Sequence, residues 1–150
     1  MKIWYIILRN GVKILNIVFL LRPKAQVSYI YDDNTVRQGI EKMKAHGYTA
    51  VPVITRDGRY VGTITEGDLL WNVLEKYNGN IKSLEKQKVR EIVRKSFNPS
   101  VPVSTKIDEL LNRVCKQNFV PIVDDRGAFM GIVTRKSVIE YLHNNLKNDK

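Results

Sequence analysis

The sequence AVPVI at residues 50–54 returns as FVPIV at residues 119–123, a shift of 69 residues. In both places a proline stands inside a short apolar run that is typical of a buried strand. The same shift matches three further pairs: Gly58 with Gly127, Gly62 with Gly131, and Thr65 with Thr134. Because repetition at a fixed spacing marks duplicated structural units, the chain is predicted to hold two copies of one unit.

The regions upstream of these strands repeat as well. Three apolar positions at helical spacing recur at a shift of 71 residues: Val36, Ile40 and Met43 as Ile107, Leu111 and Val114. A shift of 71 here and 69 further on means that the second copy has a loop two residues shorter. Each copy is therefore a complete unit of about sixty residues with the same order of elements.

The first copy predicts the order β-α-β-β-α. Its elements are a β-rich run at 27–31, a helix from Val36 to His46 capped by Thr35, strands at 51–54 and 60–64 joined by an Asp57-Gly58 turn, and a helix at 66–77 capped by Thr65. The second copy predicts a short helix at 89–95, a strand at 101–103, a helix at 107–116, strands at 120–123 and 129–133, and a helix from 135 to about 145.

We divide the chain into an apolar N-terminal lead-in at 1–22, a first repeat at 23–78, a linker at 79–88 and a second repeat at 89–146. A three-stranded sheet cannot bury both of its faces within one copy. The two copies are therefore expected to pack on each other about a pseudo-twofold axis, in an α+β fold.

Composition narrows the function classes. Cys115 is the single cysteine, so no intramolecular disulfide can form, and no Cys/His cluster predicts zinc. This indicates a reducing, cytoplasmic location, and we expect Cys115 to be a buried, inert thiol in its helix. The net charge of +10 favours anionic partners, but the basic residues are dispersed, so nucleic-acid binding is not expected.

The first 22 residues are strongly apolar. Polar residues interrupt them at five positions: Lys2, Arg9, Asn10, Lys13 and Asn16. No run reaches the roughly 18 apolar residues that a membrane span needs, and neither a membrane span nor a signal peptide is expected. We expect this segment to pack on the domain; a membrane-surface anchor and translated upstream sequence are the alternatives.

The repeated motifs resemble the CBS domain. In the first copy these motifs are AVPVI, the Asp-Gly turn, YVGTIT at 60–65 and TEGD at 65–68; in the second they are FVPIV, MGIVT at 130–134 and TRKS at 134–137. The resemblance covers residues 17–143. It implies two tandem CBS repeats, a Bateman module, whose members bind AMP, ADP, ATP, S-adenosylmethionine or cyclic dinucleotides between the repeats, and which pair into a flat homodimer.

The Thr-x-x-Asp corner at 65–68 suits a nucleotide chemically. At the start of a helix it places a hydroxyl and a carboxylate beside free backbone N–H groups. The carboxylate can accept from both ribose hydroxyls, and the N–H groups suit a phosphate. The resemblance implies that this corner faces the proline-containing strand of the other repeat. The residues of this cleft, the Asp68 cleft, are Thr65, Asp68, Asn118, Phe119, Val120 and Pro121.

The second cleft, the Arg135 cleft, departs from the pattern because Ser137 replaces the ribose-binding acid. By the same resemblance its residues are Thr134, Arg135, Lys136 and Ser137 opposite Tyr48, Thr49, Ala50, Val51 and Pro52, with Gln26, Val27 and Ser28 alongside. Loss of a carboxylate beside two cations favours phosphate charge. The cleft is similar to that of stand-alone bacterial CBS-pair proteins that bind cyclic di-AMP.

No nucleophile elbow, phosphate-binding loop or dinucleotide glycine motif is present, so an enzyme is not expected. The function indicated is a regulator that senses an adenine nucleotide, such as cyclic di-AMP, AMP, ADP or ATP, and acts on a protein partner not identifiable from sequence. A structural interaction module without ligand and a nucleic-acid-binding protein are the alternatives.

Overall fold

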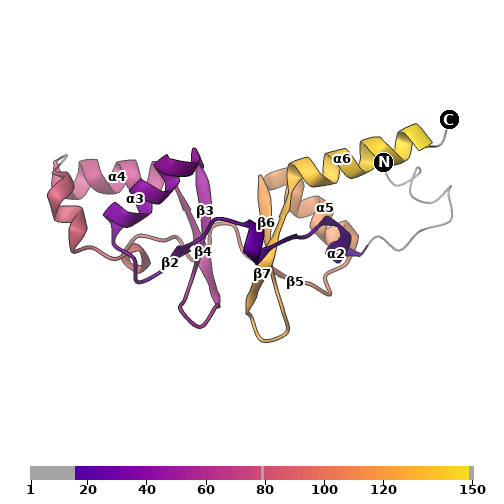
Figure 1. Cartoon of the computed structure of the whole chain (residues 1–150), viewed down its shortest axis with the longest axis horizontal. Coiled ribbons are helices and arrows are strands. Elements are labelled where there is room, and N and C mark those ends of the chain that lie inside the picture. The colour runs from indigo at the N-terminus through magenta and orange to yellow at the C-terminus, as the bar shows by residue number, and fades with distance from the viewer. Residues whose placement is uncertain (1–15, 79, 149–150) are drawn as a thin grey trace.

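The computed structural model describes residues 16–78 and 80–148, which form an elongated molecule of two similar halves (Figure 1). Residues 1–15, most of the predicted lead-in, lie outside the described residues. Each half is a small sheet covered by helices on one side, and the two sheets meet at the middle of the molecule.

The first half has the predicted order of elements. They are β2 (Ile30–Tyr31), α3 (Val36–His46), β3 (Ala50–Ile54), β4 (Tyr60–Thr65) and α4 (Glu66–Tyr77), with the sheet order β2-β3-β4. β2 runs parallel to β3, and β4 runs antiparallel to it. Thr35 and Thr65 cap α3 and α4 through reciprocal hydrogen bonds with Gln38 and Asp68, as the capping-box pattern requires.

The second half repeats this arrangement. Its elements are β5 (Val101–Pro102), α5 (Ile107–Lys116), β6 (Phe119–Val123), β7 (Phe129–Thr134) and α6 (Arg135–Asn148). The chain before the first repeat adds β1 (Arg22–Pro23), which gives the sheet order β1-β7-β6-β5. Helix α2 (Ile17–Leu20) buries Ile17 and Leu20 in the core of this second half. The beginning and the end of the chain thus contribute to one core.

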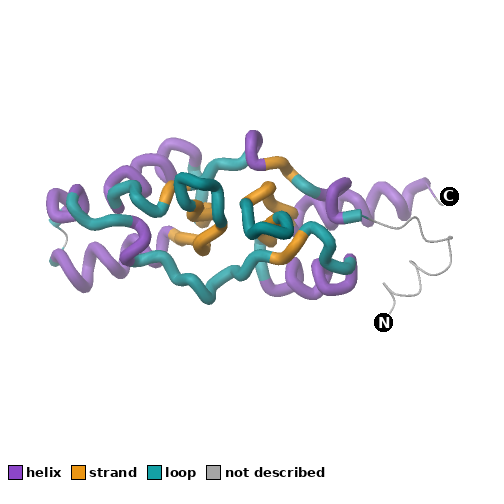
Figure 2. The backbone as a smooth tube through the Cα atoms, turned by 90° about the horizontal axis from the view of Figure 1, so that it is seen from below, coloured by secondary structure: helices purple, strands orange, loops and turns teal. Residues whose placement is uncertain are grey.

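The two halves contact each other through their β-hairpins. The N–H of Phe129 donates to the carbonyl of Gly58 at 2.8 Å, and the rings of Tyr60 and Phe129 stack with centroids 6.2 Å apart. Ile54, Ile132 and Phe119 join the same apolar cluster. Seen from below, the hairpins lie at the centre with one half on each side (Figure 2). The predicted packing about a pseudo-twofold axis is confirmed.

Three local predictions were wrong. The run at 27–31 forms a strand only at Ile30–Tyr31, because the chain before it makes the 3₁₀ helix η1 (Lys24–Gln26) and crosses to the other half. The helix expected at 89–95 is only the 3₁₀ helix η3 (Val89–Glu91), preceded by η2 (Ile81–Glu85). Cys115 is exposed, because the buried face of α5 is formed by Leu110 and Val114.

The outer strand of each sheet is short, so part of the neighbouring strand has no partner on that side. β2 pairs with only Val53 and Ile54 of β3, so residues 50–52 have no strand partner on that side among the described residues. A proline, which has no N–H, fits at such an edge. In the same way, β5 pairs with only Ile122 and Val123 of β6, so residues 119–121 have no strand partner on that side among the described residues. Within these two Pro-containing segments, residues 51–52 and 120–121 are buried, and Ala50 and Phe119 are the partly exposed members.

Glycine is required where the incoming chain crosses each hairpin. A Cβ on Gly131 would overlap the carbonyl oxygen of Arg22 in β1, and the φ of Gly131 is 152°. At the equivalent Gly62, a Cβ would lie 3.0 Å from the carbonyl oxygen of Arg94. The repeated glycines of the sequence thus mark two close backbone contacts.

We predict that Gly131→Ala lowers the free energy of unfolding by about 1–3 kcal/mol, the cost typical of overpacking, because β1 must move away from β7. Urea unfolding followed by circular dichroism measures this change. Gly67→Ala is the matched control, since its Cβ would meet only the Thr65 hydroxyl at 3.7 Å in a helix, where alanine is favoured. Equal stability of Gly131→Ala and the native protein would contradict the close contact.

Candidate functional site

A cavity of about 450 Å³ lies between the two halves at the Asp68 cleft. The structure brings together Thr65 of the first half and Asn118 and Phe119 of the second, as the sequence predicted. Thr49 and Ala50, which were assigned to the other cleft, also line this cavity, whereas Asp68 lies behind Thr65 and outside the lining, and Val120 and Pro121 are buried strand residues outside it. The remaining lining residues are Thr63, Ser96, Phe97, Asn98, Lys116 and Gln117.

The Asp68 carboxylate is held in a dense set of hydrogen bonds. It accepts from the N–H of Thr65 at 2.9 Å and from the Thr65 hydroxyl at 2.8 Å. Arg94 completes the set, with its Nε 2.7 Å from Oδ1 and its Nη2 3.3 Å from Oδ2. Because only 13% of the Asp68 side chain is exposed, this carboxylate is a fixed, largely desolvated acceptor beside the cavity.

The wall of the cavity formed by the second repeat carries buried polar groups. Asn98 is 7% exposed. Its side-chain Nδ2 donates to the Thr63 hydroxyl, and its backbone carbonyl accepts from the Tyr60 hydroxyl at 2.7 Å. Its Oδ1, like Oε1 of Gln117, is buried without a hydrogen-bond partner among the described residues. Both residues line the cavity. Buried acceptors without partners are uncommon, and they are suited to a ligand that supplies N–H donors.

The Arg135 cleft begins with the corner between β7 and α6. The N–H of Ser137 donates to the Thr134 hydroxyl at 3.0 Å, which reproduces half of the Thr65 corner without its acid. Arg135 does not extend freely into solvent. Its Nε donates to the carbonyl of Val114 at 2.8 Å and its Nη2 to that of Cys115 at 3.4 Å, so the guanidinium stabilises the last turn of α5.

The segment predicted to face this corner follows α3. The Tyr48 ring stacks on His46 with centroids 5.6 Å apart, and the Thr49 carbonyl accepts from the N–H of Glu66 at the start of α4. Val51 and Pro52 are buried. At the side, Gln26 is exposed at the end of η1, Ser28 is half-buried, and Val27 packs in the cluster between the halves.

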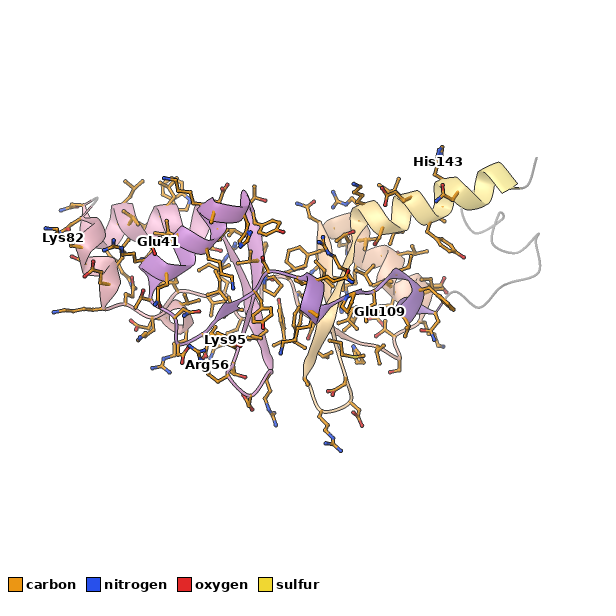
Figure 3. The ribbon with its side chains drawn as sticks, viewed as in Figure 1. Glu41, Arg56, Lys82, Lys95, Glu109 and His143 are labelled. Carbon is orange, nitrogen blue, oxygen red and sulfur yellow. The ribbon has the colours of Figure 1, made fainter. Side chains whose placement is uncertain are left out.

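Lys136 is a weaker candidate than the sequence suggested. Its side chain is 82% exposed, and its ammonium group lies 3.7 Å from Glu140 one turn along α6. A pair this exposed contributes little to binding or stability. The other histidine, His143, points outward from α6 (Figure 3). Arg135 is thus the cation of this corner that the surrounding backbone holds in place.

The sequence analysis missed the residues at the start of the second repeat that line the Asp68 cleft, and the internal repeat contained the signal for them. The shift of 71 that aligns Ile30 with Val101 also aligns residues 26–28 with 97–99. Because 26–28 were assigned to one cleft, the repeat predicts Phe97 and Asn98 in the other. The ion pair of Arg94 had no such signal, since the residue equivalent to Arg94 is Pro23.

Comparison with known proteins identifies the class of this chain. The family model of the CBS domain matches residues 21–75 and again 89–144. The chain belongs to the CBS domain family and contains two CBS domains.

Individual relatives are distant but similar in length. A crystal structure of CbpB in complex with c-di-AMP has a TM-score of 0.83 at 22% identity, over 90% of this chain and 89% of that one. Cyclic di-AMP receptor B of Bacillus subtilis is 22% identical over 82% of this chain and 83% of its own length. Uncharacterized protein MJ1426 of Methanocaldococcus jannaschii is 26% identical, over 75% and 84%. The TM-score establishes the shared fold.

Two searches of the described residues gave negative results. Across residues 16–78 and 80–148, no helix is long and apolar enough to cross a membrane. In the same part of the chain, no group of three His, Cys, Asp or Glu side chains is placed to hold a metal ion.

Tyr60 gives a pH-dependent test of the wall between the halves. Burial raises the pKa of its hydroxyl to about 12, whereas an unfolded tyrosine ionises near 10. The folded state therefore keeps a proton that the unfolded state loses. We predict that the free energy of unfolding falls by roughly 2–3 kcal/mol from this group as the pH rises from 10 to 12.

The measurement is urea unfolding of the native protein and of Tyr60→Phe at pH 9 and at pH 11.5. The difference in stability between the two proteins should shrink at the higher pH. A constant difference would show that Tyr60 is not buried against Asn98 and Phe129.

Proposed function

We propose that this chain is a regulatory protein that binds cyclic di-AMP in the Arg135 cleft and transmits its occupancy to a protein partner. The observation that carries the proposal is the charge at the start of α6. Residues 135–137 bring the anchored cation Arg135 and no acid to the N-terminus of a fourteen-residue helix, whose dipole also attracts anions. The equivalent residues 66–68 in the first half bring two acids.

The anchoring of Arg135 supports a phosphate contact. Two of its N–H groups donate to the carbonyls of Val114 and Cys115, and a guanidinium has five. The head group is thereby fixed beside the α6 N-terminus before any ligand arrives, which lowers the entropy lost on binding. Ser137 offers a hydroxyl where the other cleft has the Asp68 carboxylate, so a dianionic ligand meets no acid there.

The predicted opposite segment suits a purine. Tyr48 is partly exposed and offers a ring face for stacking, and Ala50, partly exposed at the edge of β3 that has no strand partner, offers backbone groups to a base edge. The likeness to CbpB and to cyclic di-AMP receptor B supports the choice of cyclic di-AMP among the adenine dinucleotides. We further propose that the Asp68 cleft accepts a mononucleotide such as AMP, ADP or ATP.

We predict that Arg135→Ala weakens cyclic di-AMP binding at least tenfold, because a charge-assisted hydrogen bond is worth about 1.5–3 kcal/mol. Lys136→Ala is the matched control, an adjacent cation paired only with Glu140, and it should change the affinity less than threefold. Isothermal titration calorimetry at two salt concentrations measures both, and raising the salt should weaken the native protein more than Arg135→Ala.

The same titrations separate the alternatives. An interaction module without ligand would bind neither cyclic di-AMP nor AMP, ADP or ATP. A nucleic-acid-binding protein would bind oligonucleotides with a steep salt dependence and would not distinguish Arg135→Ala from Lys136→Ala. Equal affinity of native protein and Arg135→Ala for cyclic di-AMP would contradict the proposed site.

We also propose a homodimer formed through α4 and α6, which lie along the same edge of the molecule (Figure 1). Leu70, Trp71 and Leu74 on α4 and Ile139 on α6 are about half exposed, and the shift of 69 makes Leu70 and Ile139 equivalent positions. A helix face with this much exposed apolar area is suited to a protein contact. The second half keeps only the Leu70 position apolar, since Glu140 and His143 stand where the first half has Trp71 and Leu74, so the apolar contact would be centred on α4.

Trp71→Glu should convert the dimer to a monomer at micromolar concentration, as measured by analytical ultracentrifugation. Arg126→Glu introduces the same side chain in the turn of the β6–β7 hairpin, away from both helices, and should leave the mass unchanged. A native protein that sediments as a monomer would contradict the dimer.

We place the protein in the cytoplasm, where the single exposed thiol stays reduced.

A further inference from the structure

The Asp68 cleft contains an ion pair within the chain. The guanidinium of Arg94 reaches both oxygens of the Asp68 carboxylate, with Nε–Oδ1 at 2.7 Å and Nη2–Oδ2 at 3.3 Å. The same carboxylate accepts from the backbone and the hydroxyl of Thr65. Thr65 and Arg94 together make four donor contacts to this carboxylate, about as many as its two oxygens accept, so a ribose diol could take two of these positions only by displacing Arg94, because the Thr65 bonds form the cap of α4.

The backbone of Arg94 is fixed, but its side chain is half exposed. Arg94 pairs with Thr63 in an isolated bridge, and its carbonyl lies against Gly62. Its guanidinium lies over the Phe97 ring at 4.0 Å, and Phe97 lines the cavity. The label of Lys95 shows where this part of the second repeat lies in Figure 3. The cation is therefore next to the cavity and free to change partners without a change in the main chain.

The internal repeat shows that this pair belongs to one cleft alone. The residue equivalent to Arg94 is Pro23, and the residue equivalent to Asp68 is Ser137. Both members of the pair are neutral in the Arg135 cleft, so acid and cation occur together or not at all. Such joint presence is what a direct functional link between the two side chains requires.

The charges decide which ligands can open the pair. The guanidinium of Arg94 is half exposed, so a ligand can reach the pair from the side of the arginine. The carboxylate left behind is largely buried and needs new donors, which ribose hydroxyls supply. The released guanidinium needs a new anion, which a phosphate supplies bidentately. A nucleoside satisfies only the first of these needs.

We propose that Arg94 is the specificity residue of the Asp68 cleft: it exchanges the Asp68 carboxylate for a ligand phosphate, so that the cleft takes a phosphorylated nucleoside and rejects the bare nucleoside. The proposal rests on the proposed function for the class of ligand. The unpartnered acceptor of Asn98 on the same cavity is an independent sign that a donor-bearing ligand completes this site.

The experiment compares AMP with adenosine by calorimetry in an Arg135→Ala background, which removes the anion contact of the other cleft. The native Arg94 should bind AMP at least tenfold more tightly than adenosine. Arg94→Met keeps the length of the side chain without its charge, and it should bind adenosine several-fold more tightly and AMP at least tenfold more weakly. The preference for AMP should therefore disappear.

Two controls separate specificity from simple loss of structure. Arg90→Met removes an exposed arginine four residues earlier and should keep the preference for AMP. Asp68→Asn should weaken AMP and adenosine together. A purely structural Arg94 would likewise weaken both ligands together on mutation to Met, with no gain for adenosine.

An unchanged ratio of AMP to adenosine affinity in Arg94→Met overturns the inference. If cyclic di-AMP still binds the native protein in an Arg135-dependent way, that result leaves the proposed function intact. If neither cyclic di-AMP nor AMP binds the native protein, the proposed function and the inference both fail.

Discussion

The contact between the two β-hairpins, in which Phe129 donates to Gly58 and stacks on Tyr60, is the interaction on which the other features of the molecule depend. Each sheet is covered by helices on one side only, so its other face is buried by the sheet of the other half. The cavity at the Asp68 cleft is lined by residues of both halves. A ligand bound in it would therefore touch both halves and report on how they are packed.

Duplication explains why the same strand edge and helix start occur twice, and divergence explains why the two helix starts differ in charge. The short strands β2 and β5 leave equivalent edges free at residues 50–52 and 119–121. At the start of the following helix, one copy has Asp68 paired with Arg94, while the other has Ser137 beside Arg135. The same backbone thus presents an acid that is neutralised from within to one cleft and an anchored cation to the other.

The sequence predicted most of the fold because the fold is local and repeated. The caps Thr35 and Thr65, the hairpin glycines and the apolar periodicity of α3 and α5 all lie within a few residues of the elements that they define. The juxtaposition of Thr65 with Asn118 and Phe119 was also predicted, although only through the resemblance to the CBS domain.

The details missed by the sequence depend on contacts between segments far apart in the chain. β1 joins the second sheet because residues 22–23 cross the molecule, which no local pattern indicates. Arg135 bonds to carbonyls 20 and 21 residues away, and Arg94 bonds to an acid 26 residues away. Since an arginine can reach a partner anywhere within its length, its sequence position reveals the charge but not the bond.

A crystal structure of the protein grown with cyclic di-AMP tests the central claim, that the two clefts differ in the ligand they accept. The account predicts one dinucleotide per chain in the Arg135 cleft, with a phosphate on Arg135 and a base against Tyr48, while Arg94 and Asp68 remain paired. Cyclic di-AMP in the Asp68 cleft, with Arg135 still directed only at the carbonyls of α5, would contradict it.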